Sequence, residues 1–513
     1  MRNEYRRKFR KKEADSGAGK TFLFPTPLLF VLILQKNKGN MYISPKNSVH
    51  NNWEHDLHYI RAKAIKSQRN SFINNGGPYK PGRFYRHFNE WKYFQIYGLG
   101  RGVAEVNSER KMKMKEVFKL VTREHNGESS CNLDFLSKGN AEKIRDFHKS
   151  FPVYRPTPLA HLPETARCLG LGDIYVKDES YRFGLNAFKV LGGSYAIGNY
   201  LAGRLGRRIE DVDYQTLVSE ETRKELGDIT FVTATDGNHG RGVAWTANQF
   251  KQKAVVYMPK GSAEERLKNI RAEGAEASIT DLNYDEAVRL ADSQAQQKGW
   301  VMVQDTAWEG YEDIPTWIMQ GYGTMGLEAY EQLPEKPTHI FLQAWVGSMA
   351  GAITGLFSSI YGKDRPVITI VEPNKADCLY RTAEADDGQR HFVTGDMDTI
   401  MAGLACGEPC SIGWNILADY AVHFISCPDY AAAKGMRILG NPVKDDTRVI
   451  SGESGAAAFG CVAEIMTNPE LADMKEKLGL DENSRVLFFS TEGDTDQENY
   501  RAIVWDGKYS SAK

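Results

Sequence analysis

The decisive stretch of this sequence is RFGLNAFKVLGG at residues 182–193, in which Lys189 follows apolar residues and stands just before two glycines. Lysine is seldom buried, because its ammonium group is strongly hydrated. Apolar surroundings favour the neutral amine, which can then act as a nucleophile and form a Schiff base with a carbonyl compound. The alternative is a surface lysine on a helix, and this stretch alone does not decide between the two. Asn186 is predicted to cap the helix that follows, and Gly192 and Gly193 to allow close helix packing.

Beyond this stretch, from about residue 150, short apolar and β-branched segments alternate with helical segments. This order is typical of parallel sheets covered by helices. Helices are predicted after residues 237–240, near 262–266 and at 285. The predicted strands are residues 174–177, 230–234, 254–258, 277–280, 339–343, 367–371 and 485–490. Because ligands bind at the carboxyl ends of strands in open α/β sheets, the turns after these strands are candidate sites.

Three such turns carry small or polar residues. TATDGNHGRG at residues 233–242 suits a bound anion or ring, with an ordinary strand-to-helix turn as the alternative. FSTEGDTD at residues 489–496 offers hydroxyl groups to a neutral ring nitrogen, with a polar C-terminal turn as the alternative. QAWVGSMAGA at residues 343–352 is neither a Walker A loop nor a good GxGxxG motif. A phosphate can bind there to the backbone N–H groups at a helix N-terminus, namely those of Gly347, Ser348, Met349, Ala350 and Gly351.

The composition is that of a soluble globular protein. The chain has 513 residues, of which 41% are hydrophobic and 26% charged, and its formal net charge is -1. This balance gives no reason to expect a nucleic acid or an anionic membrane as partner. The seven cysteines are scattered without a CxxC pair, which predicts reduced thiols in a reducing compartment such as the cytoplasm and no metal site.

The N-terminal region has a different character. Residues 1–12 are strongly basic, and residues 28–34 form an apolar run that is too short to span a bilayer. This order resembles a signal peptide, but no small-residue cleavage site follows it. We therefore expect a disordered or wrongly assigned leader rather than an export signal.

The chain resembles the tryptophan-synthase-β-like group of pyridoxal phosphate (PLP) enzymes, called fold type II. The resemblance is carried, in chain order, by Lys189, the Gly-Asn-His turn (residues 237–239), the small-residue loop (residues 343–352) and the C-terminal hydroxyl groups (residues 490–491). The resemblance implies that Lys189 forms a Schiff base with PLP and that Asn238 contacts its 3′-oxygen. It also implies that residues 347–351 bind the phosphate, and that Ser490, or alternatively Thr491, faces the pyridine nitrogen.

The fold that this resemblance implies is α/β, with two open-sheet domains that have helices on both faces. We expect an irregular, largely disordered N-terminal extension over residues 1–130. A larger PLP-binding domain is expected over residues 131–195 and 312–513, and a smaller α/β domain over residues 196–311. Enzymes of this type are commonly homodimers.

A narrower resemblance is to the diaminopropionate ammonia-lyase family, and it extends from about residue 135 to residue 510. It is carried by residues 154–159, 177–180, 236–245, 304–311, 315–322, 401–409, 451–456 and 490–496. It implies α,β-elimination of D- and L-2,3-diaminopropionate to pyruvate and two molecules of ammonia. Lys189 would remove the α-proton of the L isomer, and Asp236 that of the D isomer. Asp236 and Asp305 would supply negative charge near the second ammonium, although from the residues alone Asp305 also suits a helix N-cap.

Three other functions compete with this one. A serine or threonine dehydratase of the same fold usually has Ser at the position of Asp236. A PLP-binding protein without catalysis has no need of Lys189, Asp236 and Asn238 together. A nicotinamide-dependent enzyme would require a GxGxxG motif followed by an acidic residue, which is missing here.

Overall fold

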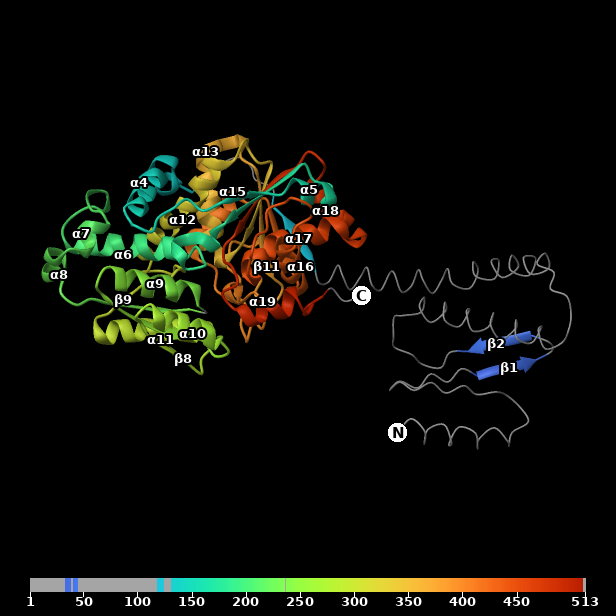
Figure 1. The fold of residues 1–513 in the computed structure, drawn as a ribbon, viewed down its shortest axis with the longest axis horizontal. Coiled ribbons are helices and arrows are strands. Elements are labelled where there is room, and N and C mark those ends of the chain that lie inside the picture. The colour runs from blue at the N-terminus through green and yellow to red at the C-terminus, as the bar shows by residue number, and fades with distance from the viewer. Residues whose placement is uncertain (1–32, 38–39, 45–117, 124–130, 236, 511–513) are drawn as a thin grey trace, which may run out of the picture. The chain divides into compact units, whose positions relative to one another are not determined.

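The computed structural model describes residues 33–37, 40–44, 118–123, 131–235 and 237–510 (Figure 1). The chain divides into two compact units, residues 1–100 and residues 101–512. In the first unit, β1 (Ile33–Asn37) and β2 (Asn40–Ser44) form an antiparallel pair. The basic leader lies outside the described residues, as does most of the apolar run. No helix of the described chain has both the length and the apolar character needed to cross a bilayer.

The second unit contains a seven-stranded sheet and a four-stranded sheet. Across the larger sheet the order is β3 (Lys119–Thr122), β12 (His423–Cys427), β11 (Val367–Pro373), β10 (His339–Gln343), β13 (Arg485–Ser490), β5 (Asp173–Asp178) and β4 (Leu159–His161). The five inner strands are parallel, whereas the edge strands β3 and β4 pair antiparallel. The smaller sheet is fully parallel, in the order β8 (Glu276–Ile279), β7 (Lys253–Met258), β6 (Thr230–Ala234) and β9 (Val301–Met302).

Helices cover both faces of the larger sheet. Alternate side chains of β10 enter different hydrophobic cores, Ile340 and Leu342 one core and Phe341 the other. Successive side chains of a strand point to opposite faces, so both faces are buried. The α-helices of the described chain are α4 (Lys138–Lys149), α5 (Pro163–Leu169), α6 (Val190–Arg204), α7 (Tyr214–Val218), α8 (Glu220–Leu226), α9 (Asn238–Gln249), α10 (Glu264–Ala272), α11 (Tyr284–Lys298), α12 (Asp313–Gln332), α13 (Ser348–Tyr361), α14 (Cys378–Ala385), α15 (Ser411–Tyr420), α16 (Asp429–Gly440), α17 (Glu453–Thr467), α18 (Ala472–Leu478) and α19 (Gln497–Val504).

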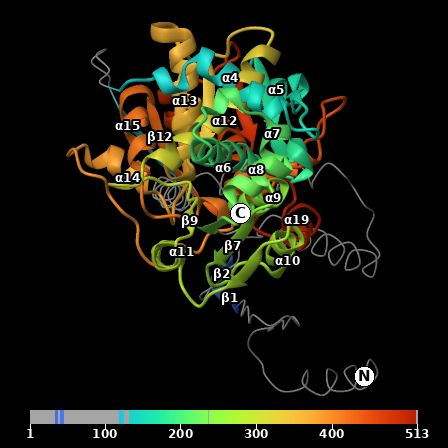
Figure 2. The same ribbon diagram turned by 90° about the vertical axis from the view of Figure 1, so that its left-hand side faces the viewer.

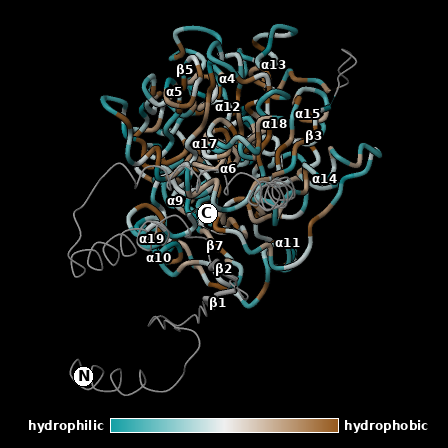
Figure 3. Tube along the Cα trace, turned by 90° about the vertical axis from the view of Figure 1, so that its right-hand side faces the viewer, coloured by the Kyte–Doolittle hydropathy of each residue, from teal (hydrophilic) through white to brown (hydrophobic). Residues whose placement is uncertain are grey.

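Local sequence signals explain individual elements. Helix α11 begins with a capping box, in which the Asn283 side chain accepts the Glu286 N–H and the Glu286 carboxylate accepts the Asn283 N–H. The helix ends at Gly299, whose φ of 67° is left-handed. Figure 3 shows α11 in largely hydrophilic colours, as expected for a helix with only one apolar face.

The fold class predicted from the sequence is confirmed, and each of the seven predicted strands is present. Strands β3, β4, β9 and β12 were not predicted. The strands of the smaller sheet all lie within residues 196–311, and we propose the domain boundaries given above on that basis. Strand β3 pairs with β12 although it lies within the predicted N-terminal extension, so the larger sheet includes residues before 131.

Candidate active site around Lys189

Lys189 follows β5 through a short helical turn, η3 (Glu179–Gly184), and stands directly before α6. The backbone between them is unusual, because Phe183 and Asn186 have φ values of 52° and 60°. Non-glycine residues adopt such angles only where the surrounding structure holds them. The Asn186 side chain donates to Asp494 at 3.1 Å, and α6 has no side-chain cap. The prediction that Asn186 caps this helix is therefore wrong. Its amide instead connects the segment from Phe183 to Lys189, which we call the lysine loop, to the turn after β13.

The Lys189 side chain is only 3% exposed, which excludes the surface-lysine alternative. Its ammonium donates a hydrogen bond to the Asp305 carboxylate. Aromatic rings cover other sides of it: its Nζ lies 4.0 Å from the ring centroid of Trp345, 5.3 Å from that of Phe188 and 5.8 Å from that of Tyr322. Among the residues that the structure describes, the amine thus has a single ionic partner, within an aromatic pocket.

Asp305 is the counter-ion of this amine. Burial alone would raise the pKa of Asp305, but Lys189 and, after it, His239 lower that pKa to about 2. The Nδ1 atom of His239 lies 4.0 Å from the Asp305 carboxylate, and its Nε2 is 2.8 Å from the Val303 carbonyl oxygen. Asp305 does not cap a helix, since α12 begins only at Asp313. The carboxylate is therefore ionised at neutral pH and available to pair with cations.

The turn after β13 lies directly against the lysine loop. The Phe188 N–H donates to the Thr491 carbonyl at 3.0 Å, and Ala187 and Glu492 form an antiparallel bridge. The Ser490 and Thr491 side chains are both buried. The Ser490 hydroxyl donates to Ser451 at 2.8 Å, and the Thr491 hydroxyl accepts from Gln343 at 2.8 Å. The structure thus brings the first and last candidate segments of the sequence together.

The Gly-Asn-His turn reaches the same place from the smaller sheet. Asp236 lies outside the described residues. Asn238 begins α9, is buried and donates through its amide nitrogen to the Glu492 carboxylate. Helices α9 and α6 pack closely (Figure 2), and a Cβ atom at Gly242 would lie 2.9 Å from the Cα of Val190. Glycine at this position therefore allows the turn to approach the lysine.

The small-residue loop completes the arrangement. Gly347, with a φ of 97°, precedes α13. The first four N–H groups of a helix have no partner within it, and here they belong to residues 348–351. Two of the predicted donors are already used outside the helix, because the Gly347 N–H donates to the Ala344 carbonyl at 3.0 Å and the Ser348 N–H to the Trp345 carbonyl. The Ser348 hydroxyl is fully buried and has no hydrogen-bond partner among the described residues. A Cβ atom at Gly351 would lie 2.9 Å from the Cα of Gly413, so the loop leaves no room for a side chain there. Unsatisfied N–H groups and an orphan hydroxyl suit a bound phosphate.

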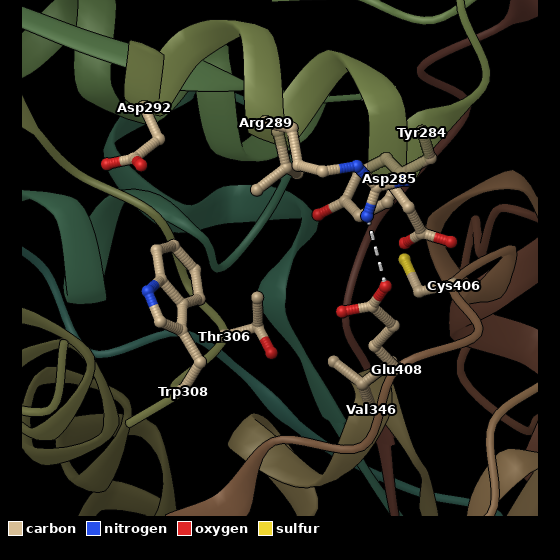
Figure 4. Close-up of a pocket in the computed structure, with 10 residues that line it drawn as sticks. Tyr284, Asp285, Arg289, Asp292, Thr306, Trp308, Val346, Cys406 and Glu408 are labelled. Atoms are coloured by element: carbon tan, nitrogen blue, oxygen red, sulfur yellow. Dashed lines mark hydrogen bonds and ion pairs between the residues drawn. The ribbon is translucent and has the colours of Figure 1, made fainter. Parts of the chain in front are cut away.

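The structure also contains a cavity of about 210 Å³ (Figure 4). Its lining includes Thr306 and Val346, which directly follow Asp305 and Trp345 in sequence. Arg289 and Glu408 form an ion pair of 3.4 Å at this cavity. Burial and then Glu408 raise the pKa of Asp285 to about 6. No sequence motif predicted this cavity, because its residues come from separate segments of the chain.

The sequence analysis also missed Trp345, Tyr322, His239 and Glu492 as site residues. All four lie within segments quoted above, but only Glu492 and His239 are polar residues that a close reading of those segments could have singled out. The aromatic residues gave no signal, because an aromatic residue near a strand or in a helix usually belongs to the core.

Comparison with known proteins agrees with this geometry. Residues 151–492 match the pyridoxal-phosphate dependent enzyme family. The chain is 54% identical over 396 residues to diaminopropionate ammonia-lyase of Salmonella typhimurium strain LT2, covering 76% of this chain and 98% of that protein. It is 52% identical over 391 residues to the Escherichia coli K12 protein of the same name, covering 75% and 96%.

Solved structures lead to the same family. Holo diaminopropionate ammonia lyase from Escherichia coli superposes with a TM-score of 0.72 at 48% identity, covering 77% of this chain and 98% of that one. The complex of that enzyme with an aminoacrylate-PLP azomethine reaction intermediate gives 0.71 at 49% identity, over 77% and 98%. Threonine deaminase isoform 2 from Solanum lycopersicum, at 19% identity, a TM-score of 0.57 and coverage of 75% and 96%, shares the fold. The chain therefore belongs to the family of pyridoxal-phosphate dependent enzymes.

Proposed function

We propose that this protein is an ammonia-lyase that converts D- and L-2,3-diaminopropionate to pyruvate and two molecules of ammonia. The observation that carries the proposal is the buried Lys189 amine, which faces a single carboxylate where four separate segments of the chain meet. The family membership and the relatives named diaminopropionate ammonia-lyase support it.

The described residues fit PLP. Of the predicted phosphate site at residues 347–351, we infer that the N–H groups of residues 349–351 and the Ser348 hydroxyl hold the phosphate, since the N–H groups of Gly347 and Ser348 already have backbone acceptors. We also infer that Asn238 donates to the 3′-oxygen and that Ser490 or Thr491 faces the ring nitrogen. When bound to an amino acid, PLP acts as an electron sink that makes the α-proton acidic. A hydroxyl partner, unlike a carboxylate, does not favour protonation of the ring nitrogen.

Lys189 has two tasks in this proposal. Its Nζ anchors the cofactor, and once the substrate amine has replaced it, the free amine accepts the α-proton of the L isomer. The ammonium that results pairs again with Asp305, the contact through which Lys189 lowers the pKa of that carboxyl. Asp236 would accept the α-proton of the D isomer from the opposite side of the cofactor.

Asp305 also supports the choice of substrate. Diaminopropionate differs from serine in carrying a second amine in place of a hydroxyl group, and this amine leaves as ammonia only after it gains a proton. A buried carboxylate attracts the protonated form of this amine, whereas it gains little from a hydroxyl group. This reasoning favours diaminopropionate over the alternative, serine or threonine dehydration.

The stoichiometry of ammonia tests the proposal. Purified holoenzyme would be given D- and L-diaminopropionate, D- and L-serine and L-threonine in parallel, with pyruvate (2-oxobutyrate for threonine) and ammonia measured in each reaction. We expect two molecules of ammonia per pyruvate from both isomers of diaminopropionate and a lower kcat/KM for the hydroxyl amino acids. Higher kcat/KM for serine or threonine would replace the proposal by the dehydratase alternative.

We further propose that the enzyme is a homodimer in the cytoplasm. The support is the resemblance to fold type II enzymes, together with the even charge balance and scattered cysteines. Size-exclusion chromatography coupled to light scattering would measure the molecular mass. We expect twice the chain mass of 57.7 kDa, and the mass of a monomer would contradict the proposal.

A further inference from the structure

Glu492 is a buried acid that belongs to none of the functional roles assigned above. Its side chain is 1% exposed. One carboxylate oxygen accepts the Ser454 backbone N–H at 3.0 Å, and the other accepts a hydrogen bond from the Asn238 amide. Its main chain forms the bridge to Ala187, and its carbonyl accepts the Gly452 N–H at 2.9 Å. Glu492 therefore connects the lysine loop, the Gly-Asn-His turn and the start of α17.

The contact with Asn238 has a chemical direction. An asparagine amide has two N–H donors on its nitrogen and acceptor positions only on its oxygen. An ionised carboxylate can only accept, so it selects the rotamer in which the amide nitrogen points toward Glu492. One N–H of that nitrogen is used by Glu492, and the second stays available for another acceptor. A flipped amide would place two acceptors against each other.

We propose that Glu492 is a positioning residue that fixes the amide orientation of Asn238, so that its second N–H points to the 3′-oxygen of PLP. The proposal rests on the proposed function only in that Asn238 contacts this oxygen. It predicts that a carboxylate at position 492 is needed for tight PLP binding, whichever amino acid the enzyme then acts on.

The first experiment replaces the acceptor. In Glu492→Gln, the new side chain can match the Ser454 N–H or the Asn238 amide nitrogen with its oxygen, but not both. We expect the apparent Kd for PLP, measured by titrating the apoprotein, to rise about tenfold, the loss expected for one hydrogen bond. The absorbance maximum of the bound cofactor should shift as well. An unchanged Kd and spectrum would overturn the proposal.

A control substitution separates this role from mere burial. Glu372 on β11 is 2% exposed, and its carboxylate likewise accepts two N–H groups, those of Leu379 at 3.1 Å and Tyr380 at 2.7 Å. Glu372→Gln alters a buried acceptor of two N–H groups in another part of the larger sheet. Burial raises the pKa of Glu372 to about 8, so this control matches Glu492 in burial and hydrogen bonding but not in charge. We expect it to change the thermal stability of the apoprotein and to leave the PLP spectrum as it is.

A double variant gives the sharpest test. Asn238→Asp combined with Glu492→Gln inverts the pair: the glutamine nitrogen donates to the new carboxylate, and the glutamine oxygen accepts the Ser454 N–H. Apoprotein stability should recover, but PLP affinity should stay low because position 238 no longer carries an N–H donor. Recovery of the Kd and spectrum together with stability would show that Glu492 is only structural.

Two further points keep the test decisive. If Glu492→Gln is insoluble, Glu492→Ala, which removes both acceptor oxygens, is expected to weaken PLP binding in the same way, and wild-type affinity in that variant would overturn the proposal. The readout is PLP binding rather than turnover. A wild-type protein that binds PLP but does not act on diaminopropionate would reject the proposed lyase and leave the test of Glu492 intact.

Discussion

Lys177 and Lys189 lie twelve residues apart, at the end of β5 and just before α6, and both are buried, yet their surroundings differ. The Lys177 ammonium contacts the Thr157 carbonyl at 2.7 Å, the Gln332 side chain at 2.8 Å and the Glu328 carboxylate at 2.8 Å. Three donors thus meet three acceptors. These contacts belong to a buried ionic cluster in which Glu328 and Glu179 also pair with Arg182.

Lys189 instead has one carboxylate and aromatic rings around it. Aromatic faces attract the ammonium but do not hold it in a fixed hydrogen-bond geometry. Burial alone therefore does not identify a reactive lysine. The distinguishing feature is an amine with one carboxylate partner and aromatic surroundings, which becomes a nucleophile toward a carbonyl carbon once it has lost a proton.

The largest expected difference comes from removing each lysine in turn. Lys189→Ala should abolish the visible absorbance of the bound cofactor and lower kcat/KM by at least about 10²–10⁴-fold, the usual contribution of a catalytic base. Lys177→Met should instead lower the free energy of unfolding by about 3–5 kcal/mol, because it leaves the buried carboxylates incompletely paired. Spectra, pyruvate formation and denaturant unfolding of both variants would check this contrast. An unchanged spectrum in Lys189→Ala would reject Lys189 as the anchor.

The counter-ions should show the same contrast. Glu328→Gln leaves Arg182 and Lys177 with too little negative charge and should destabilise the fold by about 3–5 kcal/mol. Asp305→Asn should mainly lower kcat/KM for diaminopropionate, by about 10²-fold, with a smaller change in the thermal midpoint. If Asp305→Asn proved the more destabilising variant while its kcat/KM stayed normal, the two ion pairs would have the same structural role.

The stereochemical role of Lys189 can be separated from its role as anchor. Asp236→Asn should lower turnover of D-diaminopropionate by about 10²-fold, since it removes the base expected on the opposite side of the cofactor. Turnover of the L isomer should fall less, because Lys189 serves that isomer. Initial rates with each pure isomer measure the ratio, and equal losses for both would argue against two bases.

Acid should weaken both ion pairs. The pKa values of Asp305 and Glu328 are each lowered to about 2 in the folded protein, from 3.8 and 4.5. Such groups stabilise the fold at pH values above their unfolded pKa, and this contribution is lost as the pH falls toward about 2. Each is expected to contribute about 2–3 kcal/mol.

The same acid titration distinguishes the two pairs. Lys189 is the leading cause that lowers the pKa of Asp305, whereas Arg182 outweighs Lys177 in lowering that of Glu328. In Lys189→Ala, the free energy of unfolding measured between pH 6 and pH 2 should therefore no longer show the decrease that protonation of Asp305 causes. In Lys177→Met the component from Glu328 should largely remain. Parallel pH profiles for the two variants would contradict this assignment.

The smallest expected effect concerns the cavity lined by Asp285, Thr306 and Val346. Asp285, whose pKa is about 6, is charged at neutral pH and can attract a substrate with an additional ammonium group. Asp285→Asn should lower kcat/KM for diaminopropionate roughly threefold at pH 8 by weakening electrostatic attraction. The effect should disappear near pH 5, where the wild-type carboxyl is largely protonated, and kcat/KM for serine should not change. An equal effect on both substrates would contradict this role of its charge.

Most of the frame around Lys189 could be predicted from the sequence, because it consists of short apolar strands followed by polar or glycine-rich turns. Strands β4, β9 and β12 were missed for physical reasons. β4 and β9 have three and two residues, and β12 (His423–Cys427) interrupts its apolar pattern with His and Ser. The edge strand β3 lies in a region whose composition gave no periodic signal.

The site was predictable only in part. Recognisable motifs contain Lys189, Asn238, residues 347–351 and Ser490. Contacts in the structure show that these motifs lie together. The partners of Lys189 were harder to predict. Asp305 satisfied a helix-cap pattern equally well, and nothing in a linear pattern shows that Trp345 and Tyr322 face the same amine.

The position of β13 has a consequence for biosynthesis. This strand is inserted between β10 and β5 and carries the residues that brace the lysine loop, yet it is the last strand in the chain. A ribosome must therefore translate past residue 490 before the larger sheet can close. The nascent chain is expected to emerge with a gap at the centre of this sheet, and the vitamin-derived cofactor can be captured only after β13 has been made.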